Sequence, residues 1–177
     1  MKFKALSGAL AVFVSAAVTL AAQAHADVKA AAPDGMIIQI KGEVALSRDD
    51  AWSRLINLGS WWSDAHTYSG SAASMYVDAV AGGCWCELWE GGEVEHGRVI
   101  YVAQNQTLRF DAALGPLQDL GVKAALTFTL AKGSAEGRTS ITVDMKVTGS
   151  SLSGLDKLAA AVDQVLAEQV KGYVKLP

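Results

Sequence analysis

Hydrophobic and polar residues alternate with a period of two over much of the chain beyond residue 36. In the segment 38–46, Ile38, Ile40 and Val44 alternate with polar residues, which predicts a strand with one buried face because successive strand side chains point to opposite sides. Similar patterns predict six more strands, at 75–80, 84–89, 94–102, 107–112, 122–130 and 139–147. Seven consecutive strands with short turns predict an antiparallel meander.

Helical spacing replaces this alternation in two regions. Ser47, with Asp50 three residues on, resembles a capping box and is predicted to begin a short helix. A second short helix is predicted to carry Trp61 and Trp62, which cannot both face inward on a helix, so one of them is expected to be exposed or to cap an opening. A long helix is predicted over 155–174, where one face repeats at spacings of three and four, at Leu155, Leu158, Val162, Val165, Gln169 and Tyr173.

The long helix needs an apolar surface against which to bury this face, and the concave side of the meander provides one. We therefore predict an α+β helix-grip fold, in which a seven-stranded antiparallel curved sheet wraps around the C-terminal helix and two short helices follow the first strand. Leu158, Val162 and Val165 are expected to be buried. A curved sheet and a single helix leave space between them, and such spaces commonly bind small molecules.

The first 26 residues have the pattern of a secretory signal peptide. Lys2 and Lys4 precede an apolar run, and Ala24-His25-Ala26 forms a small-x-small cleavage site. A membrane anchor needs about 20 apolar residues, whereas this run is shorter and no basic stop follows it. We therefore expect a signal peptide at 1–26, a flexible lead-in at 27–35, a single domain at 36–177, and a protein that is exported to the periplasm or secreted, with no stable membrane insertion after cleavage.

Composition narrows the possible partners. The formal net charge is -3 and the sequence pI is about 5.6, and Lys and Arg are scattered, so there is no basic face for nucleic acid. The sequence does not specify an oligomeric state.

The segment 82–102 carries the densest chemistry and is predicted to be a β-hairpin that turns at Gly91-Gly92. A two-residue turn there pairs Glu87 with His96 across the strands. The residues expected on the same face, toward the cavity, are Trp85, Glu87, Trp89, Val94, His96 and Arg98. Cys84, Cys86 and Leu88 are expected on the other face.

Three chemical states are open for Cys84 and Cys86. Their Cα atoms are expected roughly 6.5 to 7 Å apart on a regular strand, at or beyond the limit for a disulfide, so a bridge needs a local bulge. Two unpaired buried thiols are favoured over a bridge, and a bridge over a metal site. His96 is expected on the opposite face and cannot complete a metal trio with the cysteines, so no metal is predicted.

Glu87 and His96 are the best acid/base pair, since a carboxylate opposite an imidazole orients the ring and is expected to raise the pKa of His96. A self-satisfied polar pair at the rim of a cavity is the favoured alternative to catalysis. His66 lies near Asp64 and Tyr68 in a predicted loop. A solvated loop histidine is the favoured interpretation there, and His66 is a weak catalytic candidate. Five tryptophans either belong to the core or line a ligand cavity: Trp52, Trp61, Trp62, Trp85 and Trp89.

Short motifs along the chain support a family resemblance: Ala51-Trp52-x-x-Leu55 with Trp61-Trp62, Gly82-Gly83-x-Trp85, Gly97-Arg98-Val99 and Leu108-Arg109-Phe110. Together with the terminal helix, they resemble the START/Bet v 1-like (SRPBCC) superfamily of helix-grip proteins, especially the branch of polyketide cyclases and Hsp90-ATPase-activator-like proteins. The Asp-Pro-Glu common in that branch is absent, and Asn57-Leu58-Gly59 stands in a shorter loop. The resemblance implies a cavity for an apolar small molecule and carries over no catalytic residue.

These observations favour an exported binding or carrier protein for a hydrophobic small molecule, such as a lipid or a polyketide-like aromatic. The residues expected to contact this ligand are Trp61, Trp62, Trp85, Glu87, Trp89, His96 and Arg98. One alternative is a cyclase- or hydrolase-type enzyme that uses Glu87 and His96 in the same cavity. The other is a protein-interaction module related to chaperone activators, which export disfavours because ATP-driven chaperones are cytosolic. No cofactor is expected.

Overall fold

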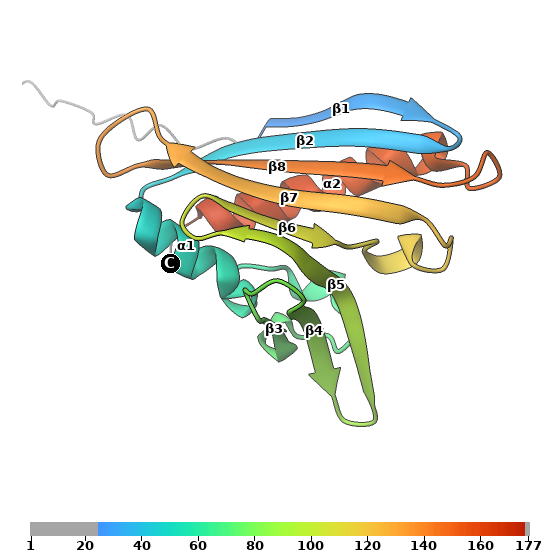
Figure 1. Cartoon of the computed structure of the whole chain (residues 1–177), viewed down its shortest axis with the longest axis horizontal. Coiled ribbons are helices and arrows are strands. Elements are labelled where there is room, and N and C mark those ends of the chain that lie inside the picture. The colour runs from blue at the N-terminus through green and yellow to red at the C-terminus, as the bar shows by residue number, and fades with distance from the viewer. Residues whose placement is uncertain (1–24, 176–177) are drawn as a thin grey trace, which may run out of the picture.

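The computed structural model describes residues 25–175 and consists of one antiparallel sheet packed against a long helix (Figure 1). The α-helices are α1 (Arg48–Ile56) and α2 (Leu155–Val174), and the strands are β1 (His25–Ala32), β2 (Gly35–Val44), β3 (Met75–Val77), β4 (Cys84–Trp89), β5 (Gly92–Ala103), β6 (Thr107–Asp111), β7 (Lys123–Lys132) and β8 (Thr139–Thr148). The strands lie in the order β1-β2-β8-β7-β6-β5-β4-β3. This arrangement is an α+β fold compatible with a helix grip, but the sheet has eight strands rather than the seven predicted.

The additional strand is β1, which occupies most of the segment 27–35 that the sequence led us to expect as a flexible lead-in. It pairs antiparallel with β2, and Val28 packs against the hydrophobic core. The Ala-rich sequence lacks the alternation that marks the other strands, so pairing with β2 and packing against α2 decide its structure. Residues 1–24 of the expected signal peptide lie outside the described residues. Between residues 25 and 175, no helix is long and apolar enough to cross a membrane.

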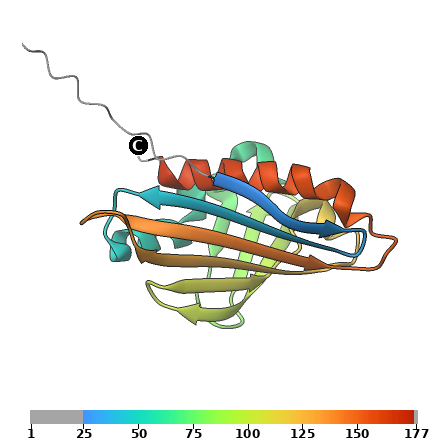
Figure 2. The ribbon, with the colours of Figure 1, turned by 90° about the horizontal axis from the view of Figure 1, so that it is seen from above.

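Helix α2 runs along one face of the sheet, next to β1 and β2, as the view from above shows (Figure 2). Its fully buried positions include Ala159, Leu166 and Val170. Three positions that we expected to be buried are only half-buried, because each of them borders a cavity: Leu158, Val162 and Val165. Leu158 and Val162 also pack against the hydrophobic core. The apolar face of α2 is thus divided between the sheet and this cavity.

The C-terminal end of α2 is fixed by α1. Arg54 donates hydrogen bonds to the carbonyl oxygens of Tyr173 at 2.8 Å and Gly172 at 3.1 Å, which satisfies terminal carbonyls and places a positive charge at the negative end of the helix. The Tyr173 hydroxyl donates to the carbonyl of Ala51 at 2.7 Å. A Cβ at position 172 would lie 2.3 Å from the carbonyl oxygen of Trp61, so glycine permits this close approach.

Trp61 and Trp62 are both buried, with 6% and 8% of their surface exposed, so neither is exposed to solvent, but Trp62 lines the cavity. The second short helix is a 3₁₀ turn (Leu58–Ser60) that ends just before them, so neither tryptophan is held to helical geometry. Their indole nitrogens donate to backbone carbonyls, Trp61 to Arg54 at 2.8 Å and Trp62 to His66 at 3.0 Å. Both rings can therefore enter the core with their polar atoms satisfied.

Candidate functional site

The hairpin between β4 and β5 turns one residue earlier than predicted. Trp89 pairs with Gly92, so the turn residues are Glu90 and Gly91, and Gly91 has a φ of +84°. Gly92 is instead needed for a close contact, since a Cβ there would lie 2.5 Å from the Trp89 ring. Moving a two-residue turn by one position slides the partner strand by two residues, which leaves every side chain on its original face.

A β-bulge at His96 then changes the faces further along β5. Pairing passes from Glu95 directly to Gly97, so His96 is an extra residue without a partner in β4. His96 itself remains inside, with 5% of its surface exposed. Beyond the bulge, Arg98 pairs with Cys84 and lies on the outer face with its side chain 53% exposed. The expectation that Arg98 faces the cavity is therefore wrong, because the bulge shifts the alternation by one residue.

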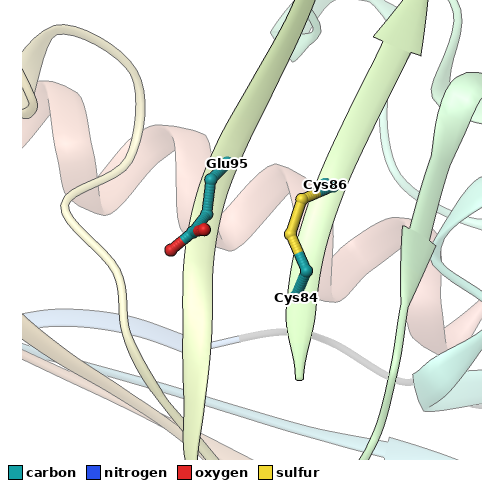
Figure 3. Close-up of side chains that lie close together, drawn as sticks. All are labelled: Cys84, Cys86 and Glu95. Atoms are coloured by element: carbon teal, nitrogen blue, oxygen red, sulfur yellow. A yellow bond between two sulfur atoms is a disulfide. The ribbon is translucent and has the colours of Figure 1, made fainter. Parts of the chain in front are cut away.

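Cys84 and Cys86 form a disulfide bond, so the prediction of two free thiols is also wrong (Figure 3). The irregular pairing between Trp85 and Cys86 brings the cysteine Cα atoms to 5.5 Å, within the range that a disulfide spans. The sulfurs and a carboxylate oxygen of Glu95 lie within 4.8 Å of one another, on the face of the sheet opposite His96. Because the two sulfurs are bonded to each other, they offer no thiolate ligands to a metal in this state.

Glu87 is fully buried and accepts three hydrogen bonds. The donors are the backbone N–H of Tyr68 at 3.1 Å, the backbone N–H of Ser69, and Nε2 of His96 at 2.8 Å. Burial alone would raise the pKa of Glu87, but the hydrogen bonds from Ser69, Tyr68 and His96 outweigh it and hold this pKa below its ordinary value. Glu87 is therefore an ionised carboxylate that ties β4 to the loop before β3.

His96 is neutral at physiological pH, although Glu87 raises the pKa of this imidazole as expected. Burial lowers the pKa of His96 and outweighs the opposing effect of the Glu87 hydrogen bond and charge. An ionised carboxylate can only accept, so the proton of the neutral imidazole sits on Nε2, which donates to Glu87. Nδ1 therefore carries an unshared lone pair. The structure thus contains the predicted Glu87–His96 pair with a defined tautomer.

A cavity of about 540 Å³ lies beside this pair, between α2, the sheet and two loops. Its wall is mainly apolar, formed by Trp62, Ala65, Leu114, Pro116, Leu117, Met145, Leu158, Ala161, Val162, Val165 and Leu166. The polar side chains on the wall are those of His66, Thr67, Tyr68, His96 and Asp119. The volume is in the range of roughly 300–1,000 Å³ that small-molecule sites occupy.

The structure separates the residues that the sequence grouped as ligand contacts. Trp62 and His96 line the cavity, whereas Glu87 lies behind His96. The remaining four do not line the cavity. Trp61 and Trp85 are in the core, and Arg98 is on the outer face of the sheet. Trp89 stacks on Tyr68, with 6.4 Å between the ring centroids. Five loop residues of the cavity wall were not predicted from the sequence: Leu114, Gly115, Pro116, Leu117 and Asp119. The apolar stripe of α2 was the available signal, but we interpreted it as core.

His66 also borders the cavity. Its Nδ1 accepts a hydrogen bond from Nε2 of Gln169 at 3.0 Å. The Gln169 side chain is buried, and its oxygen accepts from the backbone N–H of Ser63 at 2.8 Å, which fixes the amide orientation. Asp64 does not pair with His66, because its carboxylate accepts from the backbone N–H of Ala72 at 2.7 Å. His66 is thus held by α2.

Comparison with known proteins gives a fold but no family. No family model and no curated protein matches the chain. Among solved structures, it is similar to EF2215 of Enterococcus faecalis, a conserved protein of unknown function, with a TM-score of 0.55 and 11% identity over 80% of this chain and 70% of that one. It is also similar to CalU16 of Micromonospora echinospora, with a TM-score of 0.50 and 12% identity over 86% of both chains.

A third similar structure is DynU16, a protein of the dynemicin biosynthetic locus, with a TM-score of 0.54 and 16% identity. The match covers 78% of this chain but 45% of DynU16, so this chain corresponds to less than half of that protein. At these identities the likenesses show the fold alone.

Proposed function

We propose that this protein is an exported binding or carrier protein for a hydrophobic small molecule, held in the cavity between the sheet and α2. The cavity is the observation that carries the proposal. Its wall leaves Leu158, Val162 and Val165 of α2 only half-buried, and an apolar ligand would cover them. Removal of this surface from water is the main favourable contribution to binding.

Two further observations support the proposal. The fold is shared with DynU16, which comes from a biosynthetic locus, and helix-grip folds suit the binding of small hydrophobic ligands. Export is supported by the signal-like N-terminus and by the disulfide, since disulfides persist in oxidising compartments.

The test is a titration with N-phenyl-1-naphthylamine, a neutral apolar dye that becomes fluorescent in apolar sites. Two neighbouring alanines of α2 give a matched pair of variants. Both are exposed, but Ala161 borders the cavity and Ala160 does not. Ala161→Trp should weaken dye binding by roughly tenfold or more because the indole occupies the cavity, and Ala160→Trp should change it by less than about twofold.

Failure of the wild-type protein to bind the dye, or equal effects of the two substitutions, would contradict the proposal. Native mass spectrometry of the protein purified from its own host provides an independent measurement, in which a co-purifying apolar ligand is expected.

A cyclase- or hydrolase-type enzyme is the second candidate, and the Glu87–His96 pair favours it. A neutral imidazole oriented by a carboxylate can act as a general base. Within residues 25–175, however, no hydroxyl or thiol donates a hydrogen bond to His96, so no activated protein nucleophile accompanies the base. Turnover of aryl esters that is abolished by His96→Phe would favour this second candidate.

A further inference from the structure

The orientation of His96 leaves one hydrogen-bond acceptor available to a ligand. Nε2 is used by Glu87, so Nδ1 carries the free lone pair. Nδ1 accepts no hydrogen bond from the described residues, and it is not among their fully buried unpartnered polar atoms, which are Trp85 Nε1 and Asp163 Oδ1. Nδ1 therefore keeps some accessible surface, and His96 is one of the residues that line the cavity.

The surroundings make this acceptor selective. The backbone N–H groups of Tyr68 and Ser69 hold the Glu87 carboxylate in place. Because Nε2 of His96 donates to this fixed carboxylate, a flip of the imidazole ring would break that hydrogen bond. Once a ligand fills the cavity and excludes solvent from Nδ1, leaving this acceptor without a partner is costly, whereas a donor on the ligand contributes favourably to binding. An anionic ligand group at this position would be repelled by the Nδ1 lone pair and by the negative charge of Glu87 behind the ring. An ammonium group would lose its hydration in the mainly apolar cavity. A neutral O–H group avoids both penalties.

We propose that the cavity selects apolar molecules that carry a neutral hydroxyl group, whose O–H donates to Nδ1 of His96. This proposal rests on the proposed binding function and adds the chemical class of the ligand. The apolar body of the ligand packs against Leu158 and Val162 of α2, and Glu87 acts as a positioning residue that holds the imidazole with its acceptor toward the ligand.

The test compares 2-naphthol with 2-methoxynaphthalene, which share the ring system and differ in the O–H donor. The wild-type protein should bind 2-naphthol roughly tenfold more tightly in a calorimetric or fluorescence titration at neutral pH. In His96→Phe this ratio should fall to about one, because the donor has lost its acceptor. In His66→Phe the ratio should persist, because His66 uses Nδ1 to accept from Gln169 and can only donate to a probe. The oxygens of both probes can accept such a hydrogen bond, so losing it should affect both probes alike.

Four outcomes separate the two proposals. If the wild-type protein binds neither naphthalene, the binding function fails. If it binds both with equal affinity, the cavity stands and the hydroxyl preference is wrong. If the preference survives in His96→Phe, the hydroxyl is recognised elsewhere and the role of His96 is overturned. If the preference disappears in His66→Phe as well, it is not specific to His96 and the proposal is likewise overturned.

A measurement on the unmodified protein keeps the test informative if His96→Phe does not fold. Nitrogen NMR of the wild-type imidazole should show an unprotonated Nδ1 and a protonated Nε2. The Nδ1 resonance should shift on addition of 2-naphthol and not on addition of 2-methoxynaphthalene. A protonated Nδ1, or equal shifts with the two probes, would overturn the proposal.

Discussion

Replacing Glu87 with alanine should destabilise the protein strongly, because it leaves three donors, one buried and two part-buried, without their acceptor. These donors are the backbone N–H groups of Tyr68 and Ser69 and Nε2 of His96. A buried donor that loses its partner costs about 1–3 kcal/mol, and breaking a buried carboxylate pair costs about 3–5 kcal/mol in total. For a domain of this size, that corresponds to a fall of roughly 10 °C in Tm.

Thermal and urea denaturation at neutral pH measure this effect, with Glu93→Ala as the matched control. Glu93 lies in the same hairpin and is exposed. Its substitution should therefore change Tm by no more than about a degree. Glu87→Gln should lie between the two, because its oxygen still accepts while its amide group opposes one of the donors. A Tm for Glu87→Ala within a degree or so of that for Glu93→Ala would refute the role of Glu87 as the anchor of this loop.

Three other perturbations have defined outcomes. Burial lowers the pKa of His96, so the contribution of this residue to stability is present above its pKa in the unfolded state and is lost as the pH falls toward its pKa in the folded state. Tm should therefore drop on acidification below about pH 6.5, and it should drop less in His96→Phe. The Cys84–Cys86 disulfide closes only a very short loop, so its reduction should lower the free energy of unfolding by only about 1.5 kcal/mol in urea denaturation. A loss of cooperative unfolding on reduction would contradict this. Burial and the charge of Asp27 raise the pKa of Asp163, so the ionised carboxylate is destabilising and Asp163→Asn should raise Tm at pH 7 in a protein that keeps Ala26. In a protein that begins at Asp27, the α-ammonium group of Asp27 can pair with the Asp163 carboxylate, so the same substitution should give no gain in Tm.

The sequence determined the elements whose structure depends on local pattern. Helix α2 spans 155–174 as predicted, since its apolar face repeats within the helix itself. The neighbourhood of Glu87 and His96 was also predictable, because a short hairpin brings its two strands together whatever the rest of the chain does. Even the misplaced turn preserved the faces of these two residues, since it shifted the partner strand by an even number of positions.

The tertiary structure decided the features that depend on contacts between distant segments. Strand β1 forms because β2 and α2 provide surfaces for an Ala-rich segment that has no strong pattern of its own. The bulge at His96 accompanies the close packing of β5 against β6, where a Cβ on Gly97 would lie 2.5 Å from the Cβ of Ala112. This bulge turns Arg98 outward, and the same irregularity brings Cys84 and Cys86 within bonding distance. No local pattern encodes such a contact, because it depends on which strands become neighbours in the folded sheet.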